Sequence, residues 1–257
     1  MLQHEIKSVM FDLAGTLCSL SDLKLPFNSF LKDFVRNFGK DASDQEVEVN
    51  YALALMRSFQ TVGQKDFYLH RDLFSVAIKN FLELMDIDSS QDEDIDFALK
   101  NQRELTINSI RVREGVHETI LTLKDMDIIT AVVSNIDEDY FYPMLEKLEI
   151  KDKVDVCLSS EKANSCKPDM KIFRTALDLV NNCGDFKSDI TSSQTLFVGD
   201  TPFADIKGAN QASMKSVLLK TGAMKAVSNL TGESKPDFMI AKISEVLKLC
   251  SSAADNN

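Results

Sequence analysis

Two acidic residues stand directly after apolar runs, where a carboxylate could do chemistry. The run Lys7–Phe11 is rich in β-forming residues and ends at Asp12, and the run Thr195–Val198 is followed by Gly199 and Asp200. Short apolar runs that stop at such residues are typical of buried strands, and ligands of open α/β sheets bind at the carboxyl ends of parallel strands. Asp12 could therefore attack phosphorus or carbon and form an aspartyl intermediate. The simpler alternative is that Asp12 only ends a strand.

A hydroxyl and an amide follow a third apolar run. Ser134 and Asn135 come directly after the run Ile128–Val133. A hydroxyl there, together with the backbone amides of the turn, can donate hydrogen bonds to the oxygens of a phosphoryl group in transfer. A Ser-Asn pair after a strand is, on its own, more often a turn and a helix cap.

Lys167 is the candidate cation. It precedes Pro168 and Asp169, a pair typical of a helix start, and so would lie just before a helix. A lysine in that place can neutralise both the nucleophile and the anionic substrate, as phosphoryl transfer requires. The alternative is a solvated lysine beside a helix cap.

Asp200 and Asp205 suggest a metal site. They lie five positions apart after the strand that ends at Val198. Mg²⁺ takes oxygen ligands, often one or two carboxylates with several retained waters. We therefore expect Mg²⁺ to bind at this acidic pair.

These stretches, taken in order, resemble the four motifs of the haloacid dehalogenase (HAD) superfamily. Its first motif is Asp-x-Asp-Gly-Thr after an apolar strand, and this chain reads DLAGT there. The resemblance implies an aspartyl-phosphate at the first acid and Mg²⁺ held by this nucleophile, a main-chain oxygen two residues later and a fourth-motif acid. Carried over by position, the nucleophile is Asp12, the substrate phosphate is bound by Ser134, Asn135 and Lys167, and the metal ligands are Asp12, the Ala14 carbonyl oxygen and Asp200, with Asp205 close by.

Ala14 departs from this pattern, because it replaces the second acid of the phosphatase motif. That acid protonates the leaving oxygen and then activates water, and such help is worth about 10²- to 10⁴-fold in rate. A phosphatase with Ala14, whether natural or engineered, is therefore expected to be slow or to stall.

Three other hypotheses also account for the alanine at position 14. A phosphonoacetaldehyde hydrolase has a similar first motif with alanine and forms a Schiff base with a lysine, for which Lys65 is the nearest candidate. A 2-haloacid dehalogenase needs no leaving-group proton, although that branch lacks the Gly199-Asp200 pair. The chain could also be a non-catalytic HAD-fold protein that binds a ligand or partner.

The segment between the first two motifs predicts a helical bundle. Apolar residues recur at helical spacing in four successive runs without an intervening strand, and Ser43–Glu46 and Ser90–Glu93 have the capping-box pattern that starts a helix. We expect residues 20–107 to form a helical cap over the site, inserted into an α/β core of residues 1–19 and 108–257. The runs centre on Phe27–Phe38, Ala52–Phe59, Leu73–Met85 and Ile95–Gln102.

Helix and strand patterns alternate after the insert, which predicts a Rossmann-like parallel sheet with helices on both faces. A polar stretch, Asn181–Ser193, is expected to be a loop, and residues 251–257 a disordered tail. The expected helices are Val116–Lys124, Tyr140–Leu148, Ile172–Val180 and Ala204–Ala212, and the expected strands are Ile128–Val133, Val154–Leu158, Thr195–Val198 and Ser216–Leu219.

Composition limits the partners. The 257 residues include 40 acidic and 29 basic ones, a net charge of -11 that works against binding nucleic acid or an anionic membrane. Five cysteines without a Cys-x-x-Cys pair favour a reducing compartment. With neither a signal peptide nor an apolar run of membrane-spanning length, the expectation is a cytoplasmic protein. The resemblance implies a small phosphorylated metabolite as the substrate, and we expect a monomer or homodimer.

Other side chains have weaker patterns. Tyr68, His70 and Arg71 cluster at the start of the third predicted helix, where such residues are more often packing or solvated groups than ligands. His4 and His117 have no partner pattern. Cys166, beside Lys167, is expected to be a bystander thiol.

Overall fold

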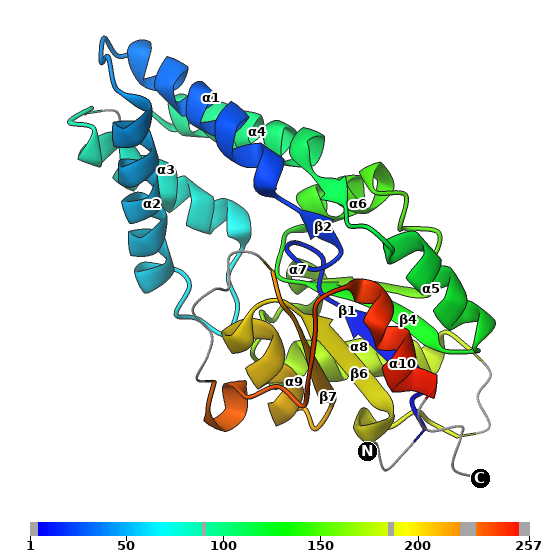
Figure 1. Cartoon of the computed structure of the whole chain (residues 1–257). Helices are drawn as coiled ribbons and strands as arrows, with labels where there is room; N and C mark the ends of the chain where they lie inside the picture. The colour runs from blue at the N-terminus through cyan, green and yellow to red at the C-terminus, as the bar shows by residue number, and fades with distance from the viewer. Residues whose placement is uncertain (1–4, 89–90, 185–187, 222–229, 252–257) are drawn as a thin grey trace.

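The computed structural model describes residues 5–88, 91–184, 188–221 and 230–251 and has an α/β core (Figure 1). Its six strands pair in parallel throughout, in the order β5-β4-β1-β6-β7-β8, which confirms the predicted Rossmann-like sheet. The strands are β1 (Ser8–Phe11), β4 (Ile129–Ser134), β5 (Val156–Ser159), β6 (Thr195–Gly199), β7 (Lys215–Leu219) and β8 (Phe238–Ile240).

The register of the central strands determines where the site lies. Every residue of β1 is buried, and Phe11 pairs with Val132 on one side and Val198 on the other. The residues that follow these strands therefore reach the same edge of the sheet. Asp12 comes one residue after Phe11, and Ser134 and Asp200 come two residues after their paired valines.

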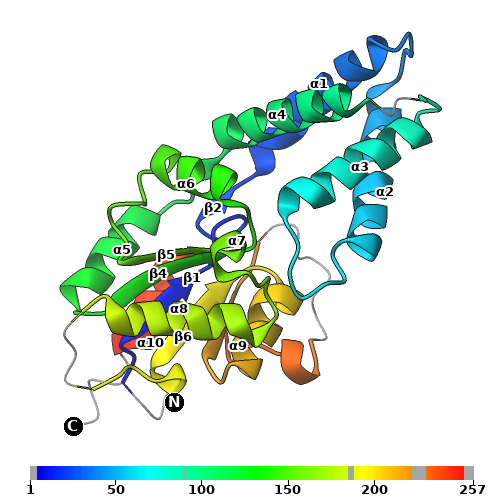
Figure 2. The same ribbon diagram turned by 180° about the vertical axis from the view of Figure 1, so that it is seen from behind.

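Helices cover both faces of the sheet, as the two opposite views in Figures 1 and 2 show. One face, including Val9 and Phe11, packs with residues of α5 (Val116–Asp125), α6 (Glu138–Lys147) and α10 (Val246–Ser251). The other, including Met10 and Phe197, packs with α8 (Met170–Asn182) and α9 (Lys207–Gln211). Successive strand residues alternate between the two cores, as a doubly covered sheet requires.

Four helices lie between residues 24 and 109 and pack around a separate apolar core that includes Phe34, Ile78 and Phe81. The Ser43 hydroxyl accepts a hydrogen bond from the Glu46 amide, as the capping pattern predicts. Within the described residues, no helix combines the length and the apolar character that a membrane crossing requires. The four helices are α1 (Lys24–Arg36), α2 (Asp44–Thr61), α3 (His70–Leu84) and α4 (Asp92–Ser109).

A short antiparallel pair joins the helical insert to the core. Strand β2 (Cys18–Ser19) leads into the insert, and β3 (Arg111–Val112) leads out of it. These strands have two residues each, too few for an alternating pattern, so the sequence gives no sign of them. They lie within a few residues of the boundaries expected at 19/20 and 107/108.

Several local expectations need correction. The helix expected over Ala204–Ala212 overlaps a π-helical turn, Pro202–Ile206, and only α9 (Lys207–Gln211) is α-helical. The expected loop begins later than Asn181, because α8 continues through Asn182. Ser251 ends α10 rather than starting the tail, and residues 252–257 lie outside the described residues.

Other differences concern the shorter elements. Helix α4 starts after Gln91 without a side-chain cap, and its expected cap, Ser90, is outside the described residues, as is His4. The short helix α7 (Ser160–Ala163) and the strand β8 were not expected. Both are too short to show a clear period.

Candidate active site

Lys167 is the centre of the site. Its Nζ donates to Asp12 Oδ1 at 2.6 Å, to Asp205 Oδ1 at 2.7 Å and to the Val133 carbonyl oxygen at 3.0 Å. The lysine is 5% exposed. Burial works to lower its pKa, but the charges of Asp12 and Asp205 outweigh that effect and raise it, so the ammonium stays charged. The predicted nucleophile and cation are therefore brought together.

Asn135 fixes the loop that carries Lys167. Its side-chain Oδ1 accepts from the Lys167 amide at 2.7 Å, and its Nδ2 donates to the Lys167 carbonyl at 2.9 Å. Asp169 then caps α8 by accepting from the Lys171 amide at 3.0 Å, which agrees with the expected helix start. The Asn135 side chain thus holds the lysine loop against the end of β4.

Ser134 contacts the same carboxylate oxygen of Asp12 as Lys167 does. Its Oγ donates to Asp12 Oδ1 over 3.4 Å, a long hydrogen bond. Its side chain is buried, and both residues line the same cavity. The hydroxyl is therefore close enough to Asp12 to contact a group bound there.

Three carboxylates gather beside the lysine. One oxygen from each of Asp12, Asp200 and Asp205 lies within 4.8 Å of the others. Burial, followed by the charge of Asp12, raises the pKa of Asp200 to about 6, and burial also raises the pKa of Asp205. Such a concentration of acidic oxygens is unfavourable without a cation beyond Lys167.

Asp205 has two partners already. Besides its contact with Lys167 Nζ, it accepts the Thr201 amide at 2.9 Å through Oδ2. Both carboxylate oxygens are thus engaged, and Asp205 shares the Lys167 ammonium with Asp12. Asp200 is less restrained, with a 3.4 Å hydrogen bond from the Thr201 hydroxyl.

The loop after β1 is shaped by Gly15. This glycine has φ +96°, in the left-handed region. Arg113, beyond β3, donates to its carbonyl oxygen from Nε at 3.1 Å and from Nη2 at 2.8 Å. No sequence pattern marks Arg113, which acts across 98 positions.

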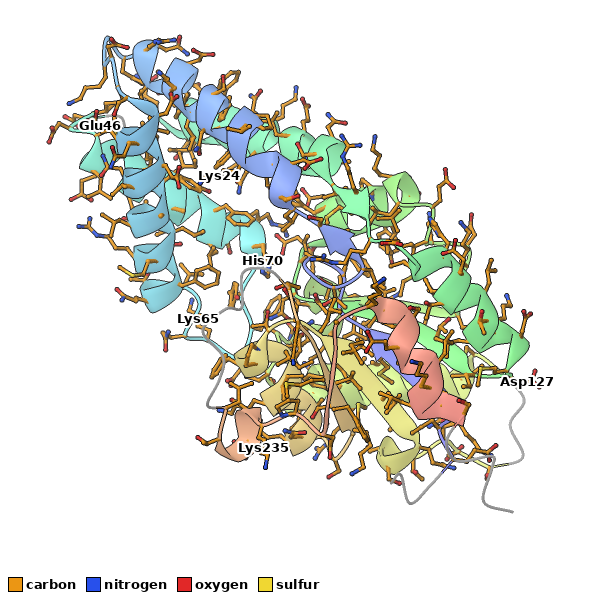
Figure 3. The ribbon with its side chains drawn as sticks, viewed as in Figure 1. Lys24, Glu46, Lys65, His70, Asp127 and Lys235 are labelled. Atoms are coloured by element: carbon orange, nitrogen blue, oxygen red, sulfur yellow. The ribbon has the colours of Figure 1, made fainter. Side chains whose placement is uncertain are left out.

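A cavity of about 970 Å³ lies between this edge of the sheet and the helical insert. Asp12, Ala14 and Lys167 line its inner end, and Lys65 and Tyr68 are among the insert residues that line it. Figure 3 labels Lys65 and His70, which come from the connection between α2 and α3 and from the start of α3. The connection thus faces the catalytic residues expected from the sequence.

The remaining side chains considered in the sequence analysis differ in whether they line the cavity. His70 lines the cavity, whereas Arg71 is absent from its lining and pairs with Glu161 at 2.8 Å. His117 is also outside the lining, with Nδ1 3.3 Å from Lys153 Nζ. Cys166 lines the cavity, but burial raises the pKa of its thiol, so it is a poor nucleophile.

Asp137 is a buried acid that sequence reasoning missed. Its carboxylate accepts the His70 amide at 2.8 Å and the Arg71 amide at 2.9 Å. A residue that follows β4 thereby caps the N-terminus of α3 in the insert. Because the partners are backbone groups of a distant segment, the only signal is a polar residue three positions after Ser134.

Comparisons with known proteins agree with this fold. A family model described as haloacid dehalogenase-like hydrolase matches residues 9–219. A Clostridium perfringens protein, PpaX, provisionally assigned as a pyrophosphatase, is 28% identical over 244 residues, 95% of this chain and 97% of its own length. A phosphoglycolate phosphatase of Mannheimia succiniciproducens is 27% identical, covering 96% of this chain and all of that protein.

Solved structures share the fold. The magnesium-bound HAD-hydrolase YfnB of Bacillus subtilis superposes with a TM-score of 0.75 at 14% identity, covering 96% of this chain and all of that one. A Haemophilus somnus protein predicted to be a phosphoglycolate phosphatase has a TM-score of 0.68 at 25% identity, covering 96% and 99%. With the family model matching most of its length, the chain belongs to the haloacid dehalogenase-like hydrolases.

Proposed function

We propose that this hydrolase is a Mg²⁺-dependent phosphatase that acts on a small phosphorylated metabolite through an aspartyl-phosphate at Asp12. The observation that carries the proposal is the buried Lys167 ammonium, 2.6 Å from Asp12 and 2.7 Å from Asp205. A fixed cation beside a carboxylate nucleophile is suited to an incoming dianion. The names of the relatives, which include phosphatases, support the same reaction class.

Each residue has a role in this proposal. Asp12 attacks phosphorus, the bond from phosphorus to the leaving oxygen breaks, and water later hydrolyses the aspartyl-phosphate. Lys167 and Ser134 bind the phosphoryl oxygens, and Asn135 contributes by holding the Lys167 loop. The helices of residues 20–107, with an apolar core of their own, form a cap that covers the substrate in the cavity and excludes water.

The residues fit a magnesium ion. Three carboxylate oxygens within 4.8 Å of one another are the hard ligands that Mg²⁺ prefers, and burial raises the pKa of Asp200 in a way that a divalent cation would reverse. Asp12, the Ala14 carbonyl and Asp200 would hold the ion, with Asp205 in support through Lys167. When bound, the ion would neutralise charge on the substrate and align it with Asp12.

The three alternative functions considered in the sequence analysis require different residues. A Schiff-base mechanism would need Lys65, which lines the cavity but is exposed to solvent. A dehalogenase or a non-catalytic binding protein would not need the Asp200 cluster that is present. The acidic cluster and the phosphatase relatives together favour phosphate-ester hydrolysis.

The test is turnover of a panel of phosphate monoesters and pyrophosphate with and without Mg²⁺. We expect Mg²⁺-dependent phosphate release that Asp12→Asn abolishes. Asp127→Asn is the matched control, because Asp127 lies at the far end of the core from the cavity (Figure 3). Turnover by the Asp12→Asn protein near the parent rate would overturn the proposal.

A further inference from the structure

His70 occupies an unusual place for a histidine in a helical insert. It is the first residue of α3, its side chain is 11% exposed, and it lines the cavity together with Asp12 and Ala14 (Figure 3). Rings pack beside it, with centroids 5.1 Å away for Tyr68 and 6.0 Å away for Phe74. The imidazole is thus held in the wall of the cavity that the nucleophile also lines.

Asp137 lies beside the imidazole ring. His70 Nδ1 is buried, makes no hydrogen bond with any residue that the structure describes, and lies 3.7 Å from Asp137 Oδ1, in ion-pair range when the ring is protonated. The Asp137 side chain has no solvent exposure. Burial favours its protonated form, but hydrogen bonds from His70 and Arg71 outweigh burial and lower the pKa of this carboxyl, so it is an anion at neutral pH.

This arrangement is a histidine and carboxylate pair. A carboxylate beside Nδ1 favours a proton on that nitrogen and stabilises the imidazolium when Nε2 also takes one. Since Nδ1 is buried against Asp137, the edge of the ring left for the cavity is the one that carries Nε2. The separation of 3.7 Å is loose for a hydrogen bond, as is common for such pairs without substrate.

We propose that His70, oriented by Asp137, is the general acid and base of this enzyme, in place of the carboxylate that Ala14 lacks. The inference rests on the proposed phosphatase function. Asp12 attacks phosphorus, and the proton on His70 Nε2 passes to the leaving oxygen as its bond to phosphorus breaks. Water then attacks the aspartyl-phosphate, gives its proton to Nε2 and releases phosphate and the Asp12 carboxylate, so the histidine ends as it began.

Three other protic side chains of the cavity suit this task less well. Burial raises the pKa of the Tyr68 hydroxyl, followed in size by the charges of Cys166 and Asp137, so it holds its proton at neutral pH. Burial has the same effect on the Cys166 thiol. Lys65 is exposed to solvent. An imidazole carries a proton on one ring nitrogen and a lone pair on the other, so it can both give and take a proton.

A double-mutant cycle between positions 70 and 14 tests the proposal. His70→Asn should lower kcat on the best phosphate ester by about 10²- to 10⁴-fold. In an Ala14→Asp background the same substitution should cost less than about tenfold, because the new carboxylate supplies the proton transfer. A residue needed only for packing would cost the same factor in both backgrounds, and that result would overturn the proposal.

Acid quench after a single turnover gives a second readout. If His70 activates water, the His70→Asn protein should accumulate phosphorylated Asp12, and His70→Gln should do the same if the asparagine variant is unstable. His117→Asn, at a histidine outside the cavity lining, should leave kcat unchanged. Asp12-dependent turnover that is insensitive to His70 would overturn this inference alone, whereas turnover independent of Asp12 would overturn the proposed function.

Discussion

Gly15 lies so close to Asp200 that any other residue at position 15 would displace the Asp200 carboxylate. A Cβ on Gly15 would lie 2.3 Å from Asp200 Oδ2 and 2.7 Å from its Cγ. The glycine also has φ +96°, which an L side chain rarely adopts. The tight turn after β1 and the position of a proposed metal ligand are therefore one structural feature.

Gly15→Ala should weaken both the fold and the metal site. Because the methyl group must push Asp200 aside, we expect about tenfold weaker Mg²⁺ binding in addition to a cost of about 1–2 kcal/mol for the positive φ. Thermal unfolding followed over a Mg²⁺ titration measures both. Gly39→Ala is the matched control, because Gly39 has φ +75° and no atom of the described residues lies within 4 Å of the added Cβ. If Gly39→Ala weakened Mg²⁺ binding as much as Gly15→Ala does, the explanation would be contradicted.

Removing the buried ammonium should destabilise the chain strongly. Lys167→Met leaves Asp12 and Asp205 without their shared partner, and breaking a buried ion pair typically costs about 3–5 kcal/mol. Urea unfolding measures the loss of unfolding free energy. Adding Asp205→Asn to the Lys167→Met protein should restore part of that free energy, because one unpaired buried carboxylate is removed. Lys151→Met, which removes an exposed pair with Glu146, should change the unfolding midpoint little. Equal effects at the two lysines would argue against a stabilising role for the cluster.

Asp200 should make the metal-free protein less stable as pH rises. Its pKa is about 6 in the fold, against an ordinary value of 3.8, so the folded chain binds more protons than the unfolded chain between these values. Its stability contribution is greatest below pH 3.8 and is lost as pH rises through about 6. Asp200→Asn should therefore raise the unfolding free energy by about 1 kcal/mol at pH 7.5 without metal, allowing for partial solvent screening.

The same variant should no longer be stabilised by Mg²⁺. Differential scanning calorimetry at pH 5 and pH 7.5, with and without Mg²⁺, separates the two effects. A metal-free Asp200→Asn protein that melts below the parent at pH 7.5 would show that Asp200 stabilises the fold, contrary to this expectation.

Ala14→Asp should raise phosphatase turnover. A carboxylate two residues after the nucleophile offers a second route for proton transfer, and we expect kcat on phosphate esters to rise about tenfold or more. Ala14→Asn is the control, because the amide has similar size and cannot carry the proton. A Schiff-base hydrolase or a dehalogenase would gain nothing from the carboxylate, so an unchanged or lower rate would favour those mechanisms.

The sequence predicts well those features that depend on a strand and the residue after it. Asp12, Ser134 and Asp200 could be placed at one edge because each follows an apolar run, and the parallel register brings those ends together. Lys167 was predicted from its neighbours Pro168 and Asp169. Their catalytic roles remain predictions, as do the cap boundaries.

Contacts between distant segments could not be predicted in this way. Arg113 reaches the Gly15 carbonyl across 98 positions, and Asp137 reaches the His70 amide across 67. Both involve backbone groups, which leave no trace in residue type. The two-residue strands around the insert are likewise too short for a period, so they become visible only when the chain is folded.

The capping of α3 by Asp137 has a consequence for motion. If the insert moved away from the core, the His70 and Arg71 amides would lose their acceptor there, and the first turn of α3 would need water instead. A lost N-cap costs about 1 kcal/mol, or a factor of about five in population. Such an open conformer would thereby be penalised, and Asp137 would favour the arrangement in which α3 lies against the core.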